Sequence, residues 1–309
     1  MSSELIPLAV SLLYGIPSFV LYVFILFQLV RLKYRKRFSN PFYGLCFAIG
    51  VVDCFGYIIY YAFFTLPMYS IASSIFSSSF FAPSALTSGI YFSLFFFGYL
   101  QLFGNCFLTM NRFTAIVFPL RHDRFWRVFF PLSIVITVAT SLAPSWKIAT
   151  AEALYVPLQS GSPHGGYAIM LTIPNPDFSF HLFLSIFITC GLCLFLNIIS
   201  VILLILRQNV GTNRKVERNF FFAALIIFLI QGIHGIHEVL FFIGISSENF
   251  GMVAVMNSML PWLMDIKFLS PPWILLCFST AVRETVVKAL PKQTHSNSTP
   301  VINITPTHT

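Results

Sequence analysis

Seven long apolar stretches constrain this chain more than any other feature of its sequence. A helix needs about 20 consecutive apolar residues to cross the hydrocarbon core of a bilayer. We place stretches of that kind at residues 5–30, 42–67, 88–110, 128–146, 180–206, 219–243 and 252–278. The sequence therefore predicts an all-α membrane protein, a bundle of seven transmembrane helices that occupies residues 1–290 as one domain. The first stretch is too long for a cleaved signal peptide, so we expect it to span the membrane.

The composition excludes an ordinary soluble protein. The chain of 309 residues is 57% hydrophobic and 9% charged, whereas soluble domains average about 25% charged residues. Phenylalanine comes in runs, as at 95–97 and 220–222, instead of alternating with polar residues. A transmembrane β-barrel alternates with a period of two, so these runs favour lipid-facing helices.

Positive charge is confined to one set of connecting segments. Sixteen of the 18 lysines and arginines follow the first stretch, separate the third from the fourth or the fifth from the sixth, or follow the seventh. Such an excess marks cytoplasmic loops, so we expect the amino terminus outside and the carboxyl terminus inside. We read the net charge of +8 as a topology signal. Nucleic acid is not expected as a partner, because it requires clustered cations on a soluble surface.

The end of the chain divides into two predicted segments. Residues 279–290 alternate apolar and charged side chains, which predicts a short amphipathic helix on the inner leaflet. Residues 291–309 are rich in Thr, Ser, Asn and Pro and predict a disordered cytoplasmic tail. Two glycosylation sequons, at Asn297 and Asn303, fall in this tail although glycosylation needs a lumenal acceptor. We give the charge asymmetry more weight, and an inverted seven-span protein stays the alternative.

Ionisable residues inside the spans each call for a partner, since a charge at the bilayer centre costs roughly 2.5 to 3.5 kcal/mol on insertion scales. Asp53 lies about 16 Å along the second span, near mid-membrane, and we expect it to face the bundle interior. Two roles stay open for it. It is either a cation or proton site that changes between two states, or a buried carboxyl bonded to polar groups of neighbouring helices.

The sixth span carries Gln231, His234, His237 and Glu238 in its outer half. The spacing of Gln231, His234 and Glu238 puts these three on one face of a helix. The stripe either lines a ligand pocket open to the outside or forms interhelical hydrogen bonds without a ligand. We favour the pocket, because one carboxylate and two imidazoles exceed what packing requires. No further ligand is identifiable for a metal, so we expect neither metal nor cofactor.

Asp265 and Lys267 lie halfway along the seventh span. Residues two apart on a helix are separated by about 200° around its axis, so these side chains should point to different neighbours instead of pairing. Asp53 is a candidate partner for Lys267, and the histidines of the sixth span are candidates for Asp265. The six cysteines all fall within spans, so we expect no disulfide in the outer loops.

Two segments at the inner ends of the spans carry a family resemblance. The first runs from Asn111 to Trp126 and reads NRFTAIVFPLRHDRFW; the second runs from Leu269 to Arg283 and reads LSPPWILLCFSTAVR. With the spacing of the spans, they resemble the nematode serpentine chemoreceptors of the Srg superfamily, classes Srv and Srg. The resemblance implies a rhodopsin-like G-protein-coupled receptor in the plasma membrane, at the sensory cilium of a neuron, with a heterotrimeric G protein as partner.

The same resemblance assigns roles to residues of both segments. Asn111 and Arg112 take the place of the acid and arginine that switch rhodopsin-like receptors, although position alone fits equally an arginine snorkelling to head groups. Ser270, Pro271 and Pro272 stand at the Asn-Pro motif of those receptors, and the twin prolines should break or kink the seventh span.

We therefore interpret the chain as a chemosensory G-protein-coupled receptor. No phosphate loop, nucleophile elbow or paired zinc motif stands out, so we expect no enzyme. An extracellular small molecule or peptide would bind within the bundle and shift the receptor to a state with an open inner crevice. The alternatives are a seven-span ligand-gated channel or transporter and an accessory protein for other receptors; a homo- or hetero-oligomer stays open. The residues expected to couple to the G protein are Asn111, Arg112, Pro119, Arg121, Arg214 and Lys215.

Overall fold

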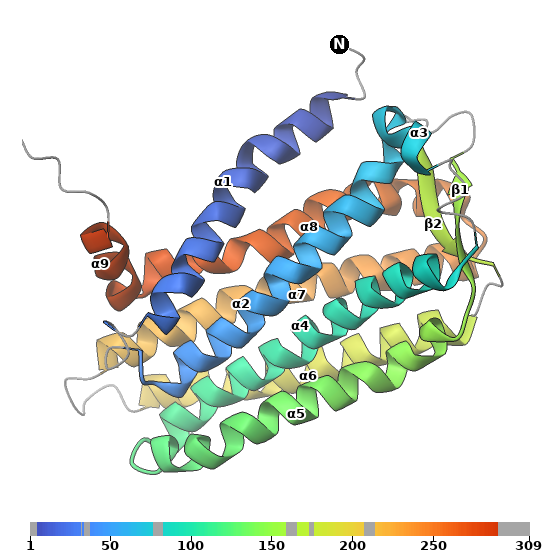
Figure 1. Ribbon diagram of the computed structural model, residues 1–309. Helices are drawn as coiled ribbons and strands as arrows, with labels where there is room; N and C mark the ends of the chain where they lie inside the picture. Colours follow the sequence, from blue (N-terminus) through green and yellow to red (C-terminus); the bar gives the residue numbers. More distant parts are fainter. Residues whose placement is uncertain are drawn as a thin grey trace, which may run out of the picture.

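The computed structural model describes residues 5–31, 33, 38–76, 83–158, 166–172, 176–206 and 214–289, without the side chains of residues 74, 176–180, 214–217 and 250. Within these ranges, seven helices are long and apolar enough to cross a membrane. They pack side by side as one bundle, so the predicted fold class is confirmed (Figure 1). The seven are α1 (Leu5–Val30), α2 (Pro41–Tyr60), α4 (Ala85–Val117), α5 (His122–Ala149), α6 (Pro176–Leu206), α7 (Arg214–Ser246) and α8 (Phe250–Phe278).

Short elements lie at the two ends of the bundle (Figure 1). At one end, α2 continues as a π-helical turn (Tyr61–Thr65) and two 3-10 turns (Leu66–Met68, Ser70–Ala72) that lead into α3 (Ser73–Phe76). The strands β1 (Ala153–Pro157) and β2 (Tyr167–Leu171) lie at this end too. At the other end, α9 (Thr280–Ala289) follows α8. Val282 of α9 is buried and Arg283 is exposed, as an amphipathic helix requires.

Helix α4 extends beyond the predicted range at both ends. It begins at Ala85 instead of 88 and ends at Val117 instead of 110. Ser84 caps its start by accepting a hydrogen bond from the Thr87 amide at 3.3 Å, and Phe118 precedes Pro119, where helical geometry is disfavoured. Hydropathy marks only the part of a helix that lies in hydrocarbon, so the predicted span ended too early. Because α4 continues to Val117, Arg112 lies inside this helix and not in a loop.

The twin prolines do not end α8. The helix continues from Phe250 to Phe278 across Ser270, Pro271 and Pro272. A break at these prolines is thus not found, and a kink stays a prediction. Helices in membranes tolerate proline where neighbouring groups satisfy the freed backbone oxygens.

An antiparallel hairpin covers the end of the bundle near α3 (Figure 1). The Ala153 amide donates to Ser88 Oγ of α4 at 3.1 Å, and the Tyr155 hydroxyl donates to the Phe63 carbonyl at 2.8 Å. Burial raises the pKa of Tyr155, so its hydroxyl keeps its proton. All six cysteines are free, so these contacts hold the hairpin without a disulfide. An apolar cluster joins the hairpin to the segment that follows α2; its buried residues are Ala72, Phe76, Ala153, Tyr155 and Ile169.

Candidate functional site

Asp53 is the centre of a polar junction between four helices. Its side chain is fully buried, and Tyr22 of α1 donates to one carboxylate oxygen at 2.7 Å. Gln101 of α4 donates to the other oxygen at 2.6 Å and lies 3.3 Å from the Lys267 carbonyl of α8. A buried carboxylate with a donor on each oxygen is satisfied. The geometry thus agrees with a hydrogen-bonded junction, while a cation or proton site at Asp53 stays a prediction.

Asp265 and Lys267 point to different neighbours, as their spacing predicts. Asp265 accepts hydrogen bonds from Ser11, at 2.7 Å, and from Tyr14, both on α1. The histidines of α7, which were candidate partners for Asp265, do not bond to it in the part of the chain that the structure describes; Ser11 and Tyr14 of α1 do. The expected ion pair between Lys267 and Asp53 is not found among the described residues either. Both oxygens of Asp53 already accept hydrogen bonds, one from Tyr22 and the other from Gln101.

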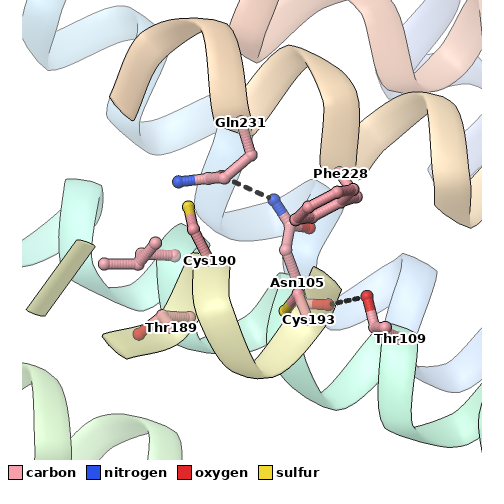
Figure 2. Close-up of a pocket in the computed structure, with 8 residues that line it drawn as sticks. Asn105, Thr109, Thr189, Cys190, Cys193, Phe228 and Gln231 are labelled. Carbon is pink, nitrogen blue, oxygen red and sulfur yellow. Dashed lines mark hydrogen bonds between the residues drawn. The ribbon is translucent and has the colours of Figure 1, made fainter. Parts of the chain in front are cut away.

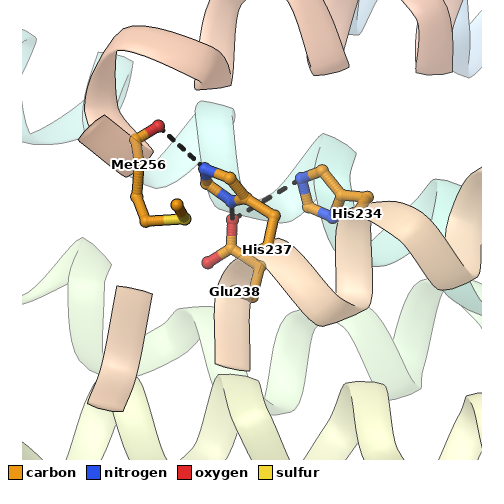
Figure 3. A network of polar contacts seen from close by, with 4 residues as sticks. All are labelled: His234, His237, Glu238 and Met256. Atoms are coloured by element: carbon orange, nitrogen blue, oxygen red, sulfur yellow. Dashed lines mark hydrogen bonds and ion pairs between the residues drawn. The ribbon is translucent and has the colours of Figure 1, made fainter. Parts of the chain in front are cut away.

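The polar residues in the second half of α7 form two separate groups. His237 is the centre of the first, shown in Figure 3: its Nδ1 lies 3.4 Å from Glu238 Oε1, and its Nε2 donates to the Met256 carbonyl of α8 at 2.9 Å. His234 Nε2 lies 3.6 Å from the same Glu238 oxygen. Three of these four residues are on α7 and the fourth is on α8. The group therefore links α7 to α8.

Gln231 belongs to the second group, which faces α4. Asn105 Nδ2 donates to Gln231 Oε1 at 3.1 Å, as Figure 2 shows. The two side chains border a cavity of about 10 Å³, which is enough space for about one water molecule. The predicted stripe on α7 is thus divided between two neighbouring helices. The residues that line the cavity are Leu102, Asn105, Thr109, Thr189, Cys190, Cys193, Phe228 and Gln231.

Arg112 lies at the opposite end of the bundle and is only 2% exposed. Its guanidinium carbon lies 4.3 Å from the ring centroid of Phe42 and 5.3 Å from that of Phe220. Arg112 Nε donates to Asn111 Oδ1 at 3.1 Å, and a second nitrogen also contacts this oxygen. An arginine that snorkels to lipid head groups would be exposed. Arg112 instead joins α4 to α2 and α7.

The turn between α4 and α5 follows Arg112 at the same end of the bundle and presents exposed side chains. Pro119 and Arg121 are exposed there, and Leu120 between them is 99% exposed. The Arg121 amide closes the turn by donating to the Phe118 carbonyl at 3.0 Å. Leu120 therefore makes almost no contact within the chain and is free to be covered by lipid or by a partner.

Of the other residues predicted to belong to the site, the structure describes some and not others. Pro271 and Pro272 are buried and Ser270 is partly exposed. Arg214 and Lys215 belong to the first turn of α7, but their side chains lie outside the described part of the chain. Asn297, Asn303 and the predicted tail also lie outside the described residues.

Sequence reasoning missed the uncharged partners in these groups. Gln101 and Asn105 are amides inside a span, and a polar side chain in lipid needs a partner just as a charge does. That signal was present in the sequence. The rings of Phe42 and Phe220 gave no comparable signal, because the chain contains 37 phenylalanines.

A family model described as Srg family chemoreceptor matches residues 8–286. The chain belongs to the Srg chemoreceptor family. Among curated proteins of Caenorhabditis elegans, this Srg chemoreceptor is 24% identical to serpentine receptor class gamma-10, over 85% of its own chain and 79% of that protein. It is 28% identical to serpentine receptor class V-1 over 40% of its own chain, and this match spans 37% of that protein's length. The predicted resemblance is confirmed.

Membership in the Srg family decides the broad class of the molecule. This Srg chemoreceptor is a multi-pass membrane protein of the serpentine type, with seven apolar helices. The family is one of receptors and not of enzymes. The match includes both the buried Arg112 near the carboxyl end of α4 and the twin prolines of α8.

Proposed function

We propose that the chain is a chemosensory G-protein-coupled receptor that binds a ligand within its bundle and activates a heterotrimeric G protein. The observation that carries this proposal is the burial of Arg112 where α2, α4 and α7 meet. A cation held there becomes available to a partner only when these helices separate. The family supports the receptor class, and the asymmetry of cations supports an outer amino terminus and an inner carboxyl terminus. The resemblance suggests the membrane of a sensory cilium.

The ligand would act on the group formed by His234, His237 and Glu238. Because His237 bonds to the Met256 carbonyl, a ligand that competes for His237 or Glu238 changes the contact between α7 and α8. Such a ligand shifts the receptor towards whichever helix arrangement it binds more tightly. Gln231, about one turn before His234 on α7, transmits the shift to α4 through Asn105.

The buried acids and Lys267 would keep the rest of the bundle together. Asp53 and Asp265 each accept hydrogen bonds from α1, and Asp53 also accepts one from α4. These junctions provide a fixed frame against which α7 can move. In this proposal, Asn111, Pro119 and Arg121 complete the inner coupling surface around Arg112, together with Arg214 and Lys215.

Nucleotide exchange is the direct test. Membranes that carry the receptor are mixed with purified heterotrimers of several Gα classes, and uptake of a non-hydrolysable GTP analogue is measured without ligand. Arg112→Ala should abolish the receptor-dependent uptake, whereas Arg127→Ala, at an exposed position on α5, should retain it at equal surface expression. Equal uptake by Arg112→Ala and wild type would overturn the proposal. Epitopes at the two termini of intact cells test the orientation separately.

A further inference from the structure

Two aromatic rings contact the Arg112 guanidinium in a buried setting. Phe42 of α2 is fully buried and Phe220 of α7 is 5% exposed. The rings stack on each other with their centroids 4.6 Å apart, so they also join α2 directly to α7. The guanidinium carbon lies within 6 Å of both centroids, which is the range of cation–π attraction. That attraction is strongest where water is excluded.

Neighbouring groups fix both rings in place. Asn40 caps α2 by accepting from the Phe42 amide at 2.9 Å, and the same oxygen lies 3.5 Å from an Arg112 nitrogen. Tyr43 meets the Phe220 ring edge-on at 5.4 Å and shares a hydrogen bond of 2.8 Å with Ser279, just before α9. The rings are thus positioned by the start of α2 and by the junction of α8 with α9.

We propose that Phe42 and Phe220 are positioning residues that retain Arg112 in the resting receptor, and that displacement of α7 releases it. This inference rests on the coupling role proposed for Arg112. Phe220 and His237 are on the same helix, about 26 Å apart along its axis. A ligand-driven tilt of α7 at His237 therefore moves the Phe220 ring away from α4. Arg112 then loses one ring and gains access to the inner surface.

The ring face, and not merely its bulk, should hold the cation. A leucine at position 220 would fill similar space without the negative face that attracts a guanidinium. Fluorine atoms on a phenylalanine ring withdraw electrons from that face and change its shape little. A series of mono-, di- and trifluorinated phenylalanines at position 220 therefore separates cation–π attraction from packing.

Spin labels can report release of α7 without any G protein. Labels at Arg218→Cys on α7 and Arg124→Cys on α5, both exposed positions, are introduced in a Cys277→Ser background because Cys277 is exposed. Pulsed dipolar spectroscopy on the full chain in lipid nanodiscs then gives the fraction of receptors with a long distance. The ratio of long to short should rise with each fluorine and reach roughly tenfold in Phe220→Leu. Phe222→Leu, 42% exposed on the same helix, should leave it unchanged.

The outcomes separate this inference from the proposed function. A flat fluorine series, with Phe220→Leu equal to wild type, would overturn the retention of Arg112 by the rings even if Arg112→Ala abolishes nucleotide exchange. A rising series without any receptor-dependent nucleotide exchange would support the rings and refute the coupling to a G protein. If Phe220→Leu does not fold, the fluorinated series alone decides, because it preserves the shape of the ring.

Discussion

Gln101 donates a hydrogen bond to Asp53 at 2.6 Å, and the same nitrogen lies 3.3 Å from the main-chain oxygen of Lys267. One uncharged side chain of α4 thereby ties the buried acid of α2 to the backbone of α8. Gln101 is 1% exposed and Asp53 is fully buried, so water cannot replace either contact. The stability of the bundle should depend on this amide more than on its exposed polar groups.

Gln101→Leu tests that dependence. The change keeps a side chain of similar length but removes a donor from a buried carboxylate, which costs about 1 to 3 kcal/mol. We expect a lower midpoint of thermal unfolding for the purified receptor in detergent. Ser93→Ala on the same helix is the control, because the Ser93 hydroxyl is exposed and bonds only to its own helix at Gly89. Equal unfolding midpoints for the two variants would show that the contacts of Gln101 with Asp53 and Lys267 do not stabilise the bundle.

The seven helices could be predicted because each one must present a long apolar run to lipid. The ends of α4 could not, since the cap at Ser84 and the proline at position 119 determine them without changing hydropathy. The hairpin of β1 and β2 was missed for another reason. Its strands are five residues each, and they are fixed by Ser88 and Phe63, which are far away in the sequence.

The candidate site shows a similar limit. The cost of burying charge identified Asp53 and Asp265 as residues that need partners, and both accept hydrogen bonds from neighbouring helices. The partners themselves depend on which helices are neighbours, and spacing along one helix does not provide this. Asp265 bonds to Ser11, 254 positions earlier in the chain, whereas the sequence suggested the histidines of α7. Helix geometry did predict that Asp265 and Lys267 point apart.

Leu120→Ser should weaken coupling without loss of stability. Leu120 is 99% exposed in the turn between α4 and α5, so its replacement disturbs no packing within the receptor. An exposed apolar side chain at the proposed coupling surface gains energy only by burial against a partner, about 1.5 to 3 kcal/mol for a leucine. Receptor-dependent nucleotide exchange should fall about tenfold or more. Leu120→Met should retain it, and unchanged exchange in Leu120→Ser would remove this turn from the coupling surface.

Glu238→Gln tests the link between α7 and α8. The amide keeps the size of the carboxylate but removes the charge that faces His237 at 3.4 Å and His234 at 3.6 Å. A buried carboxylate close to two imidazoles attracts them through its charge, so we expect reduced thermal stability and altered basal nucleotide exchange. His181→Gln, at an exposed position on α6, is the control. The link is absent if Glu238→Gln matches this control in both measurements.

Tyr155→Phe should loosen the hairpin of β1 and β2 and leave the bundle intact. The variant removes the hydroxyl that donates to the Phe63 carbonyl at 2.8 Å but retains the ring that packs against Phe76. Losing such a hydrogen bond costs about 1 kcal/mol, which corresponds to roughly a fivefold increase in the open fraction of the hairpin. Hydrogen exchange measured by mass spectrometry should therefore accelerate at residues 153–157 and 167–171 and stay unchanged in α4.

Because burial raises the pKa of Tyr155, the hydroxyl stays protonated at neutral pH, and the difference between variant and wild type should not change between pH 6 and 8. Exchange that accelerates equally throughout α4 would show that the hairpin is part of the bundle's cooperative core and does not open separately.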